Sequence, residues 1–223
     1  MIERSLFSPE HESFRESFRR FMEKEIAPFH AQWEEQGYVD RAVWNKAGDN
    51  GFLCMTMPEA YGGSGADKLF SVVQMEELAR GGFSGIGYGL HSEIVAPYIL
   101  HYGTEAQKQK YLPKLASGEM VGAIAMSEPA AGSDLQGIKA TALKQSDGSY
   151  LLNGSKTFIT NGWHADLVDC GCQDQASGWR EGNQSVAGGT RHAWFRGWQA
   201  FEETRPQGAR HFGTIFLRRE SAL

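Results

Sequence analysis

Apolar residues recur at helical spacing through the first half of the chain. Phe14, Phe18 and Phe21 lie three or four positions apart, after a Ser-Pro pair at positions 8 and 9 that is typical of a helix N-terminus. The same spacing predicts further helices over residues 40–51, 67–80, 94–102 and 104–115. The last of these opens with Thr104 and Gln107 in a capping box. We therefore expect an all-helical segment up to about residue 120.

The period changes after residue 121. Short apolar runs at 123–126, 138–143 and 150–159 are separated by Gly, Asp, Ser and Asn, which indicates strands. The sequence Ser-Asp-Gly-Ser at 146–149 predicts a hairpin turn between the last two runs. Because the helices come first and the strands second, the order favours two packed units over alternating βαβ units.

The composition changes again from residue 169. No lysine occurs after Lys156, whereas Trp179, Trp194 and Trp198 are half of the chain's tryptophans. Val186, Ile215, Leu217 and Leu223 are the only Val, Ile or Leu residues left, too few for a packed core of this length. Neither a helical nor a strand period is sustained. We expect residues 169–223 to form an irregular tail, which is either disordered or the product of a shifted reading frame in a GC-rich gene.

Charge and cysteine content restrict the classes of partner and compartment. The formal net charge of −5 gives no electrostatic reason to expect nucleic acid or an anionic membrane as a partner. No apolar run approaches the roughly 18 residues that cross a bilayer. The chain has no secretory signal pattern at its start, and three cysteines make no disulfide framework. A cytoplasmic protein without a membrane span is therefore expected.

Three other polar patterns are interpreted as structural. Residues 58–65 (Pro-Glu-Ala-Tyr-Gly-Gly-Ser-Gly) follow a predicted helix, whereas a phosphate-binding glycine loop follows a strand, so a tight turn is favoured. The adjacent acids Glu76 and Glu77 are interpreted as lying on solvated helix faces. Cys170 and Cys172 are too closely spaced for the usual zinc motif, so no metal site is expected.

Two stretches carry residue types suited to a flat polar ligand. Residues 124–134 end a predicted strand and then turn through small residues, so backbone groups and the Ser127 and Ser133 hydroxyls are accessible. Residues 158–162 (Phe-Ile-Thr-Asn-Gly) offer a ring to stack on a cofactor and a hydroxyl to hydrogen-bond its edge, at the end of the strand expected from residue 150. Each stretch alone is equally consistent with an ordinary turn.

Ordered motifs connect these stretches. Tyr-Gly-Gly-x-Gly at 61–65 and Tyr-Leu-Pro-x-Leu-Ala-x-Gly-Glu at 111–119 precede Ser-Glu-Pro-x-Ala-Gly-Ser-Asp at 127–134 and Asn-Gly-x-Lys-x-Phe-Ile-Thr-Asn-Gly at 153–162. With the helical segment before them, they closely resemble the acyl-CoA dehydrogenase family over about residues 8–168. The phrases at 122–129 and 134–139 look most like its long-chain branch.

The resemblance implies an α+β fold class and a flavin site. An N-terminal all-helical domain (1–120) is followed by an incomplete antiparallel β-barrel-like domain (121–168) and the irregular C-terminal tail (169–223). In that family FAD lies between the β-domain and a C-terminal four-helix bundle. Carried over by position, the cofactor-binding residues would be Ile124, Ala125, Met126, Ser127, Gly132, Ser133, Phe158, Ile159 and Thr160. Ser133 would also reach the acyl-CoA substrate. Ala130 stands where the family often has glycine, and its methyl group is tolerable only at negative φ.

The reaction implied is α,β-desaturation of acyl-CoA thioesters in fatty-acid β-oxidation. A carboxylate removes the α-proton, the β-hydrogen passes to the flavin as hydride, and an electron-transfer flavoprotein takes the electrons in a homotetrameric enzyme. The family's base is a glutamate of the bundle, so no catalytic residue is expected in this chain, which is expected to be truncated and inactive as written. Two alternatives remain open: a non-catalytic binding fragment, and a relative of acyl-CoA oxidase or nitroalkane oxidase.

Overall fold

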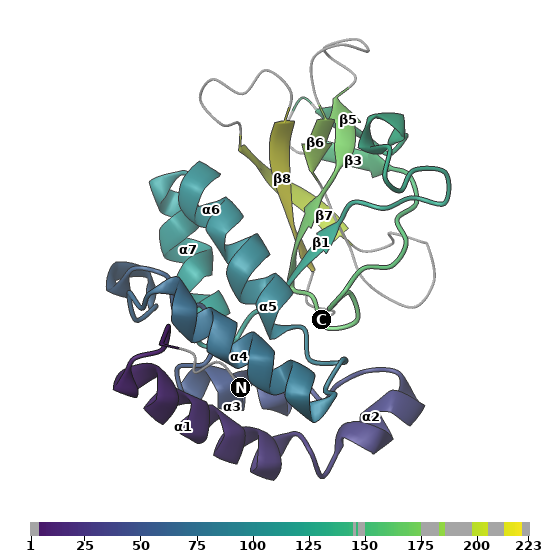
Figure 1. The fold of residues 1–223 in the computed structure, drawn as a ribbon. Helices are drawn as coiled ribbons and strands as arrows, with labels where there is room; N and C mark the ends of the chain where they lie inside the picture. The colour runs from purple at the N-terminus through teal and green to yellow at the C-terminus, as the bar shows by residue number, and fades with distance from the viewer. Residues whose placement is uncertain are drawn as a thin grey trace. The chain divides into compact units, whose positions relative to one another are not determined.

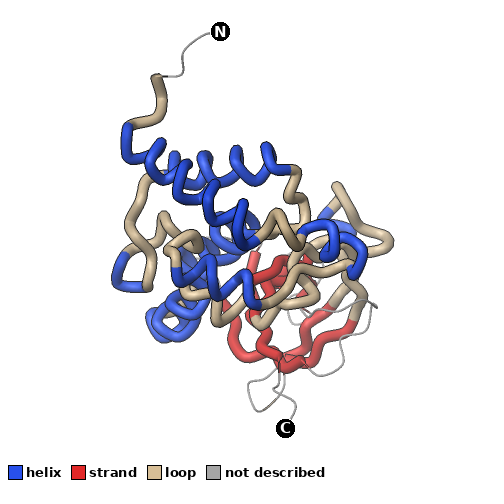
Figure 2. Tube along the Cα trace, turned by 90° about the horizontal axis from the view of Figure 1, so that it is seen from below, coloured by secondary structure: helices blue, strands red, loops and turns tan. Residues whose placement is uncertain are grey.

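The computed structural model divides into a helical unit and a sheet unit (Figure 1). The helical unit comprises Met1–Pro97 and Gln109–Glu119, and the sheet unit comprises Tyr98–Lys108 and Met120–Leu223. The structure describes residues 5–144, 146 and 150–174, together with the backbone of three strands at 183–185, 198–204 and 212–219. Figure 2 shows the same chain coloured by secondary structure, with the helices blue and the strands red.

The predicted helices are present and lie in the predicted order. The helical elements are α1 (Pro9–Glu25), α2 (His30–Gln36), α3 (Ala42–Asp49), the 3-10 turn η1 (Glu59–Tyr61), α4 (Lys68–Gly81), α5 (Tyr88–Leu90), the π-helical η2 (His91–Val95), α6 (Ala96–Tyr102) and α7 (Glu105–Ala116). The sequence predicted the helices that correspond to α1, α3, α4, α6 and α7, but not α2, α5 or most of η2. Ser8 is the N-cap of α1 and is followed by proline, as the sequence predicted. The capping box of α7 is also confirmed, because the Gln107 N–H donates to Thr104 Oγ1 and the Thr104 N–H donates to Gln107 Oε1.

Phenylalanine rings form the core beneath α1. Phe18 and Phe21 are buried, and Phe52, from the segment after α3, meets their rings edge-on at centroid distances of 5.0 and 5.1 Å. Phe14 adds a third edge contact to Phe52 at 5.7 Å. Each fully buried phenylalanine contributes roughly 1.5–3 kcal/mol by leaving water. The phenylalanines of α1, spaced three or four positions apart, therefore lie on the helix face that is buried.

Glu77 on α4 is held by two arginines of α1, so its interpretation as part of a solvated helix face is wrong. Its side chain is only 4% exposed, and its carboxylate accepts hydrogen bonds from Arg19 Nε and Nη2, both at 2.8 Å. Arg15 Nη1 donates to Glu77 at 3.1 Å and to the neighbouring Glu76 at 3.0 Å. The sequence spacing placed the two acids on different sides of the helix, but it did not indicate that α1 would cover one of them.

The glycine-rich stretch 58–65 forms a turn, as predicted. It contains η1, and Gly62 at φ +87° and Gly65 at φ +60° adopt the left-handed conformation that glycine favours. A Cβ on Gly63 would lie 2.1 Å from the Met57 carbonyl oxygen, so the backbone passes too close for any side chain. The left-handed backbone accounts for Gly62 and Gly65, and close backbone packing accounts for Gly63.

The end of α7 approaches α3 backbone to backbone. A Cβ on Gly118, whose φ is +73°, would lie 2.2 Å from the Trp44 carbonyl oxygen. A Cβ on Gly48 would lie 2.1 Å from the Ser117 carbonyl oxygen. Asn45 Nδ2 donates to the Gly118 carbonyl at 3.3 Å across the same contact. Two glycines, one on each side, are what allows these segments to touch.

The strands of the sheet unit pair in a mixed order. They are β1 (Gly122–Ala125), β2 (Thr141–Lys144), β3 (Tyr150–Asn153), β4 (Leu167–Cys170), β5 (Cys172–Asp174), β6 (Asn183–Ser185), β7 (Trp198–Thr204) and β8 (Phe212–Arg219). They lie in the order β1-β4-β8-β6-β5-β2-β3-β7, with a further pairing between β7 and β8. The arrangement of helical segment followed by sheet is confirmed. The sheet itself is not purely antiparallel, because β1·β4, β2·β5 and β6·β8 pair in parallel.

Strand boundaries differ from the sequence prediction: in the run at 138–143 the strand begins only at Thr141, as β2 (Thr141–Lys144). The strand expected over 150–159 ends at Asn153, and the chain from Gly154 to Asn161 has no regular secondary structure. The predicted hairpin is present, since β2 and β3 pair antiparallel with Lys144 opposite Tyr150, although most of its turn lies outside the described residues. In the segment from residue 169, expected to be irregular, the backbone contains the end of β4 and all of β5, β6, β7 and β8. Apart from Gly171, its remaining residues lie outside the described part of the chain.

Small side chains fill the core of the sheet unit. Ala123 and Ala125 of β1 are fully buried, with Ile138, Ala142 and Val168 around them. Small residues allow strands and loops to approach closely, which brings the loop after β1 near the segment after β3. Among the described residues, none of the helices combines the length and the apolar character that a lipid bilayer requires.

Candidate functional site

The loop that follows β1 is closed by a two-residue hydrogen-bond pair. The Glu128 N–H donates to the Ala131 carbonyl at 2.8 Å, and the Ala131 N–H donates back to the Glu128 carbonyl at 3.2 Å. Pro129 and Ala130 lie exposed at the tip of this turn, and Gly132 and Ser133 follow it, also exposed. The turn thus leaves a stretch of accessible backbone with little side-chain bulk, as the sequence predicted.

The segment after β3 is hydrogen-bonded at two positions to β1 and the loop that follows it. At one end the Thr157 N–H donates to the Ser127 carbonyl at 2.9 Å. At the other, Asn161 Nδ2 donates to the Gly122 carbonyl at 3.1 Å. Asn161 itself adopts a left-handed φ of +65°, which asparagine tolerates better than most residues. The two chemistry-bearing stretches of the sequence are therefore neighbours in the sheet unit.

Phe158 lies between these two hydrogen-bonded residues, Thr157 and Asn161. Its side chain is 96% exposed and its backbone has a φ of +56°, a conformation that is rare and strained for an aromatic residue. Burial does not hold the ring, so the surrounding backbone must hold the residue in this conformation. A strained, protruding ring on a fixed backbone is typical of a residue that contacts a ligand.

The hydroxyl groups of both stretches remain available. Within the described residues, no hydrogen bond involves the side-chain oxygen of Ser127, Ser133 or Thr160. Thr160 is exposed and Ser127 is half-buried, so both oxygens belong to side chains that solvent reaches. A hydroxyl both donates and accepts, and these groups suit the polar edge of a flat ligand.

Glu128 and Lys156 form a buried ion pair beneath the two stretches. Lys156 Nζ donates to Glu128 Oε1 at 2.8 Å and to the Met126 carbonyl at 3.0 Å, and both side chains are at most 5% exposed. Burial opposes ionisation of Glu128. The hydrogen bonds from Lys156 and from the backbone N–H groups of Lys139 and Ala140 outweigh it and hold the pKa of this carboxyl below its ordinary value.

The sequence prediction did not include this pair. The only indication in the sequence was that Glu128 and Lys156 are each a single charged residue within a run of small, apolar and hydroxyl residues. Charged residues are almost never buried unless they are paired. Nothing in the spacing indicated that these two, 28 positions apart, would meet.

The predicted cofactor-binding residues fall into two groups. Ser127, Gly132, Ser133, Phe158 and Thr160 present accessible groups on the two stretches. Ile124, Met126 and Ile159 are half-buried, and the Ala125 methyl group is fully buried in the sheet core. The Ala125 carbonyl accepts a hydrogen bond from the Gly171 N–H at 3.1 Å. The part of Ala125 left to face a ligand is therefore small.

Two further features of the sequence can be placed. Ala130 is not among the described residues with positive φ, so its methyl group is tolerated where the resembling family often has glycine. Cys170 and Cys172 are buried in the sheet core. Among the described residues, no group of three or more metal-binding side chains lies close enough to hold an ion.

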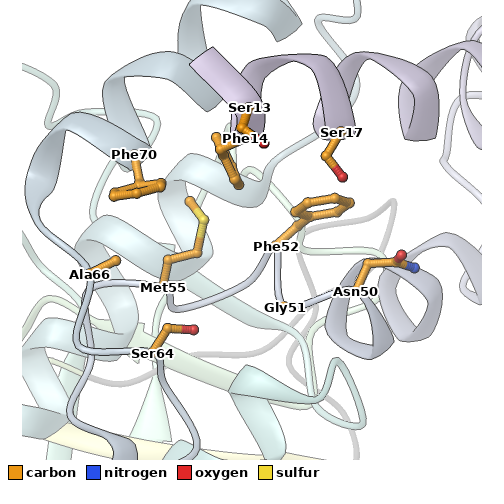
Figure 3. A pocket seen from close by; sticks show the side chains of 10 residues that line it. All are labelled: Ser13, Phe14, Ser17, Asn50, Gly51, Phe52, Met55, Ser64, Ala66 and Phe70. Carbon is orange, nitrogen blue, oxygen red and sulfur yellow. The ribbon is translucent and has the colours of Figure 1, made fainter. Parts of the chain in front are cut away.

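The helical unit has a hollow of its own, shown in Figure 3. It has a volume of about 510 Å³ and is lined by Ser13, Phe14, Ser17, Asn50, Gly51, Phe52, Met55, Ser64, Ala66 and Phe70. None of these residues carries a charge, a metal-binding imidazole or a thiol. The hollow therefore supplies hydroxyl and amide groups but no charged acid or base.

Known proteins share the helical and the sheet unit. Residues 8–119 match the family model of the acyl-CoA dehydrogenase N-terminal domain, and residues 123–188 match that of the acyl-CoA dehydrogenase middle domain. The long-chain specific acyl-CoA dehydrogenase of Mus musculus is 51% identical over 165 residues, 74% of this chain. The chain spans 38% of the length of that relative.

Solved structures of acyl-CoA dehydrogenases also resemble this chain. An acyl-CoA dehydrogenase from Geobacillus kaustophilus superposes with a TM-score of 0.79 at 44% identity, covering 99% of this chain and 57% of that one. An acyl-CoA dehydrogenase from Bacillus anthracis, complexed with FAD, superposes with a TM-score of 0.75 at 33% identity. It covers 99% of this chain and 37% of that one.

Proposed function

Because the chain belongs to the acyl-CoA dehydrogenase family, we propose that it supplies one side of an FAD site in an enzyme that desaturates acyl-CoA thioesters between the α and β carbons. The residues proposed to face the flavin are those of the loop after β1 and of the segment after β3. Ser133 is proposed to reach the CoA part of the substrate as well.

One observation carries the proposal: the exposed ring of Phe158 beside hydroxyl groups with no hydrogen bond among the described residues. The ring is 96% exposed on a strained backbone that is anchored on both sides. A flavin ring system has a flat apolar face and a polar edge. Phe158 fits the face, and Thr160 and Ser127 fit the edge.

The residues on the two stretches would perform three tasks. The Phe158 ring would stack against the flavin and exclude water from that face. The Ser127 and Thr160 hydroxyls would orient the flavin by hydrogen bonds, and Gly132 would let the backbone approach without a side chain in the way. When bound, FAD supplies the acceptor for the hydride that leaves the β-carbon.

Glu128 is not available as the α-proton base. Its two carboxylate oxygens already accept three hydrogen bonds, and its pKa is held below the ordinary value, so it is a weak base as well as a buried one. We therefore propose that the base is a carboxylate other than Glu128.

A visible spectrum of the purified chain incubated with FAD tests the proposal. Bound flavin absorbs at about 370 and 450 nm, and bleaching of the longer-wavelength band by an acyl-CoA would show that this chain desaturates it. A colourless protein after desalting would refute flavin binding and favour a non-catalytic fragment. Flavin bands that no acyl-CoA bleaches would support the cofactor site and refute desaturation by this chain alone.

The electron acceptor, assembly and compartment are proposed on family grounds. An electron-transfer flavoprotein is the proposed acceptor, and hydrogen peroxide released during turnover in air would instead favour the oxidase alternative. A homotetramer is proposed, and analytical ultracentrifugation tests it.

The sequence predicts a cytoplasmic protein, whereas the similar long-chain relatives are named as mitochondrial. Cell fractionation decides between the two compartments.

Phe158→Ala is expected to weaken FAD binding without weakening the fold. An aromatic stacking contact contributes about 0.5–1.5 kcal/mol, so we expect FAD affinity to fall about three- to tenfold. The thermal midpoint should stay unchanged, because the ring is almost fully exposed. Titration of the flavin absorbance measures the affinity.

Phe29→Ala is the matched control, since Phe29 is a partly exposed phenylalanine of the helical unit. Its FAD affinity should equal that of the unaltered chain. Equal affinity in the Phe158→Ala variant as well would show that this ring does not contact the flavin.

A further inference from the structure

One carboxylate contributes directly to the contact between the two proposed flavin-facing stretches. Glu128 Oε2 accepts from the Lys139 N–H at 2.8 Å, and Glu128 Oε1 accepts from the Ala140 N–H at 2.9 Å and from Lys156 Nζ at 2.8 Å. The loop after β1, the entry to β2 and the segment after β3 therefore converge on a single side chain. Each of these contacts is a charge-assisted hydrogen bond, the stronger class in proteins.

Lys156 completes the connection from the other side. Its ammonium group is fully buried and donates to Glu128 and to the Met126 carbonyl, both in the loop after β1. The cavity beside it has a volume of about 10 Å³, so the site is closely packed. The next residue, Thr157, donates its N–H to the Ser127 carbonyl. Two consecutive residues thus bind three consecutive residues of the other stretch.

Phe158 follows directly after this junction. Its ring makes almost no burying contact, so its direction depends on the backbone that carries it. That backbone is held by the Lys156 and Thr157 contacts before the ring and by Asn161 after it. A left-handed φ at a phenylalanine persists only when the surroundings determine it.

We propose that Lys156 is a positioning residue for the flavin site: paired with Glu128, it sets the separation and orientation of the two stretches and holds Phe158 in its strained, ligand-facing conformation. This inference rests on the proposed function, because it assigns the pair a role only where the two stretches share a ligand. The pair does not touch the ligand itself.

Lys156→Met in the full-length chain is the first test. It keeps the length of the side chain but removes the charge and both donated hydrogen bonds. We expect FAD affinity to fall about tenfold to a hundredfold, the loss typical of hydrogen bonds to charged groups. The fine structure of the band near 450 nm should also change, since the flavin would sit in a less ordered site. A loss of stability alone would change neither the spectrum nor the affinity of the folded fraction.

Lys139→Met is the matched control. Lys139 is exposed and contacts Glu128 only through its backbone N–H, which the substitution retains. The control should bind FAD as the unaltered chain does. The Lys156→Arg variant should recover part of the affinity, because a guanidinium group also donates to a carboxylate and a carbonyl.

The double variant Glu128→Gln/Lys156→Met keeps the test valid if the single variant does not fold. It removes both buried charges, which buried ion pairs often tolerate. It should fold and still bind FAD weakly. An unchanged affinity and spectrum in a folded variant would overturn the positioning role while leaving the proposed function intact.

Amide hydrogen exchange separates the two claims further. The Thr157 amide should be protected in the unaltered chain and in Lys139→Met, and should exchange faster in Lys156→Met, with or without FAD. Failure of the unaltered chain to bind FAD would refute the proposed function and, with it, a flavin-positioning role for the pair. The Thr157 exchange rate would then still measure whether the pair holds the stretches together, and unchanged protection in Lys156→Met would refute that coupling too.

Discussion

Replacing Gly118 by alanine is expected to destabilise the helical unit by about 4 kcal/mol or more. The new Cβ would lie 2.2 Å from the Trp44 carbonyl oxygen, which is backbone and cannot rotate away. Alanine at the left-handed φ of +73° adds about 1–2 kcal/mol of strain. Thermal unfolding followed by circular dichroism should show a midpoint lowered by more than about 15 °C, if the variant folds at all.

Gly51→Ala is the control that separates strain from collision. Gly51 has nearly the same φ, +69°, but a Cβ there would meet nothing within 4 Å. It should cost only the backbone strain, about 1–2 kcal/mol. A Gly118 variant that is no less stable than the Gly51 variant would contradict the close approach of the α7 end to α3.

Glu77→Gln is expected to lower the free energy of unfolding by about 3 kcal/mol. The substitution preserves the volume of the side chain but removes the buried negative charge that pairs with both Arg15 and Arg19. Removing one partner of a buried pair typically costs about 3–5 kcal/mol, and partial exposure of Arg19 favours the lower end. Chemical denaturation of the variant and the unaltered chain measures the difference.

Glu16→Gln provides the comparison on the same helix. Glu16 pairs with Arg20 at 3.8 Å, and both side chains are about 70% exposed, so its loss should cost less than about 1 kcal/mol. Equal effects of the two substitutions would show that burial does not matter at Glu77.

The Glu77 contribution should also depend on pH. The hydrogen bonds from Arg19, and to a smaller extent the one from Arg15, hold the pKa of Glu77 below its ordinary value of 4.5. They outweigh burial, which alone would raise this pKa. A lowered folded-state pKa means that the stabilisation is fully present above pH 4.5 and is lost as the pH falls through the folded pKa. The stability difference between the unaltered chain and Glu77→Gln should therefore shrink as the pH is lowered from about 6 to about 3.

The helices were predictable because their signals are local. Ser8 with the following proline, and Thr104 with Gln107, satisfy backbone groups within one turn, so their residue types alone indicate the helix start. The period of Phe14, Phe18 and Phe21 similarly reports one buried face. Ion pairs between elements lack such a signal, which is why the burial of Glu77 was missed.

The flavin-facing stretches were predictable only in part. Their residue types suggested accessible backbone and hydroxyl groups, and a resemblance to known motifs joined them. The strand after residue 150 was predicted to extend too far, because apolar residues up to Ile159 suggested a continuous strand. Hydrogen bonds to β1 and the Lys156–Glu128 pair hold this segment out of the sheet instead. Contacts between residues 28 or 39 positions apart cannot be predicted from the spacing of neighbouring residues.

The parallel pairing of β1 with β4 has a consequence for folding kinetics. Gly122 pairs with Leu167, 45 positions later, so this ladder closes only after β2, β3 and the anchored segment have been synthesised and have collapsed around it. Contacts of such high order form slowly, because the entropy of closing the loop is lost before the pairing stabilises the product. The individual helices, whose backbone hydrogen bonds are local, should form before this ladder. A cofactor that binds only the completed sheet would therefore not nucleate folding. It would bind after the slow pairing step and stabilise the native state by mass action.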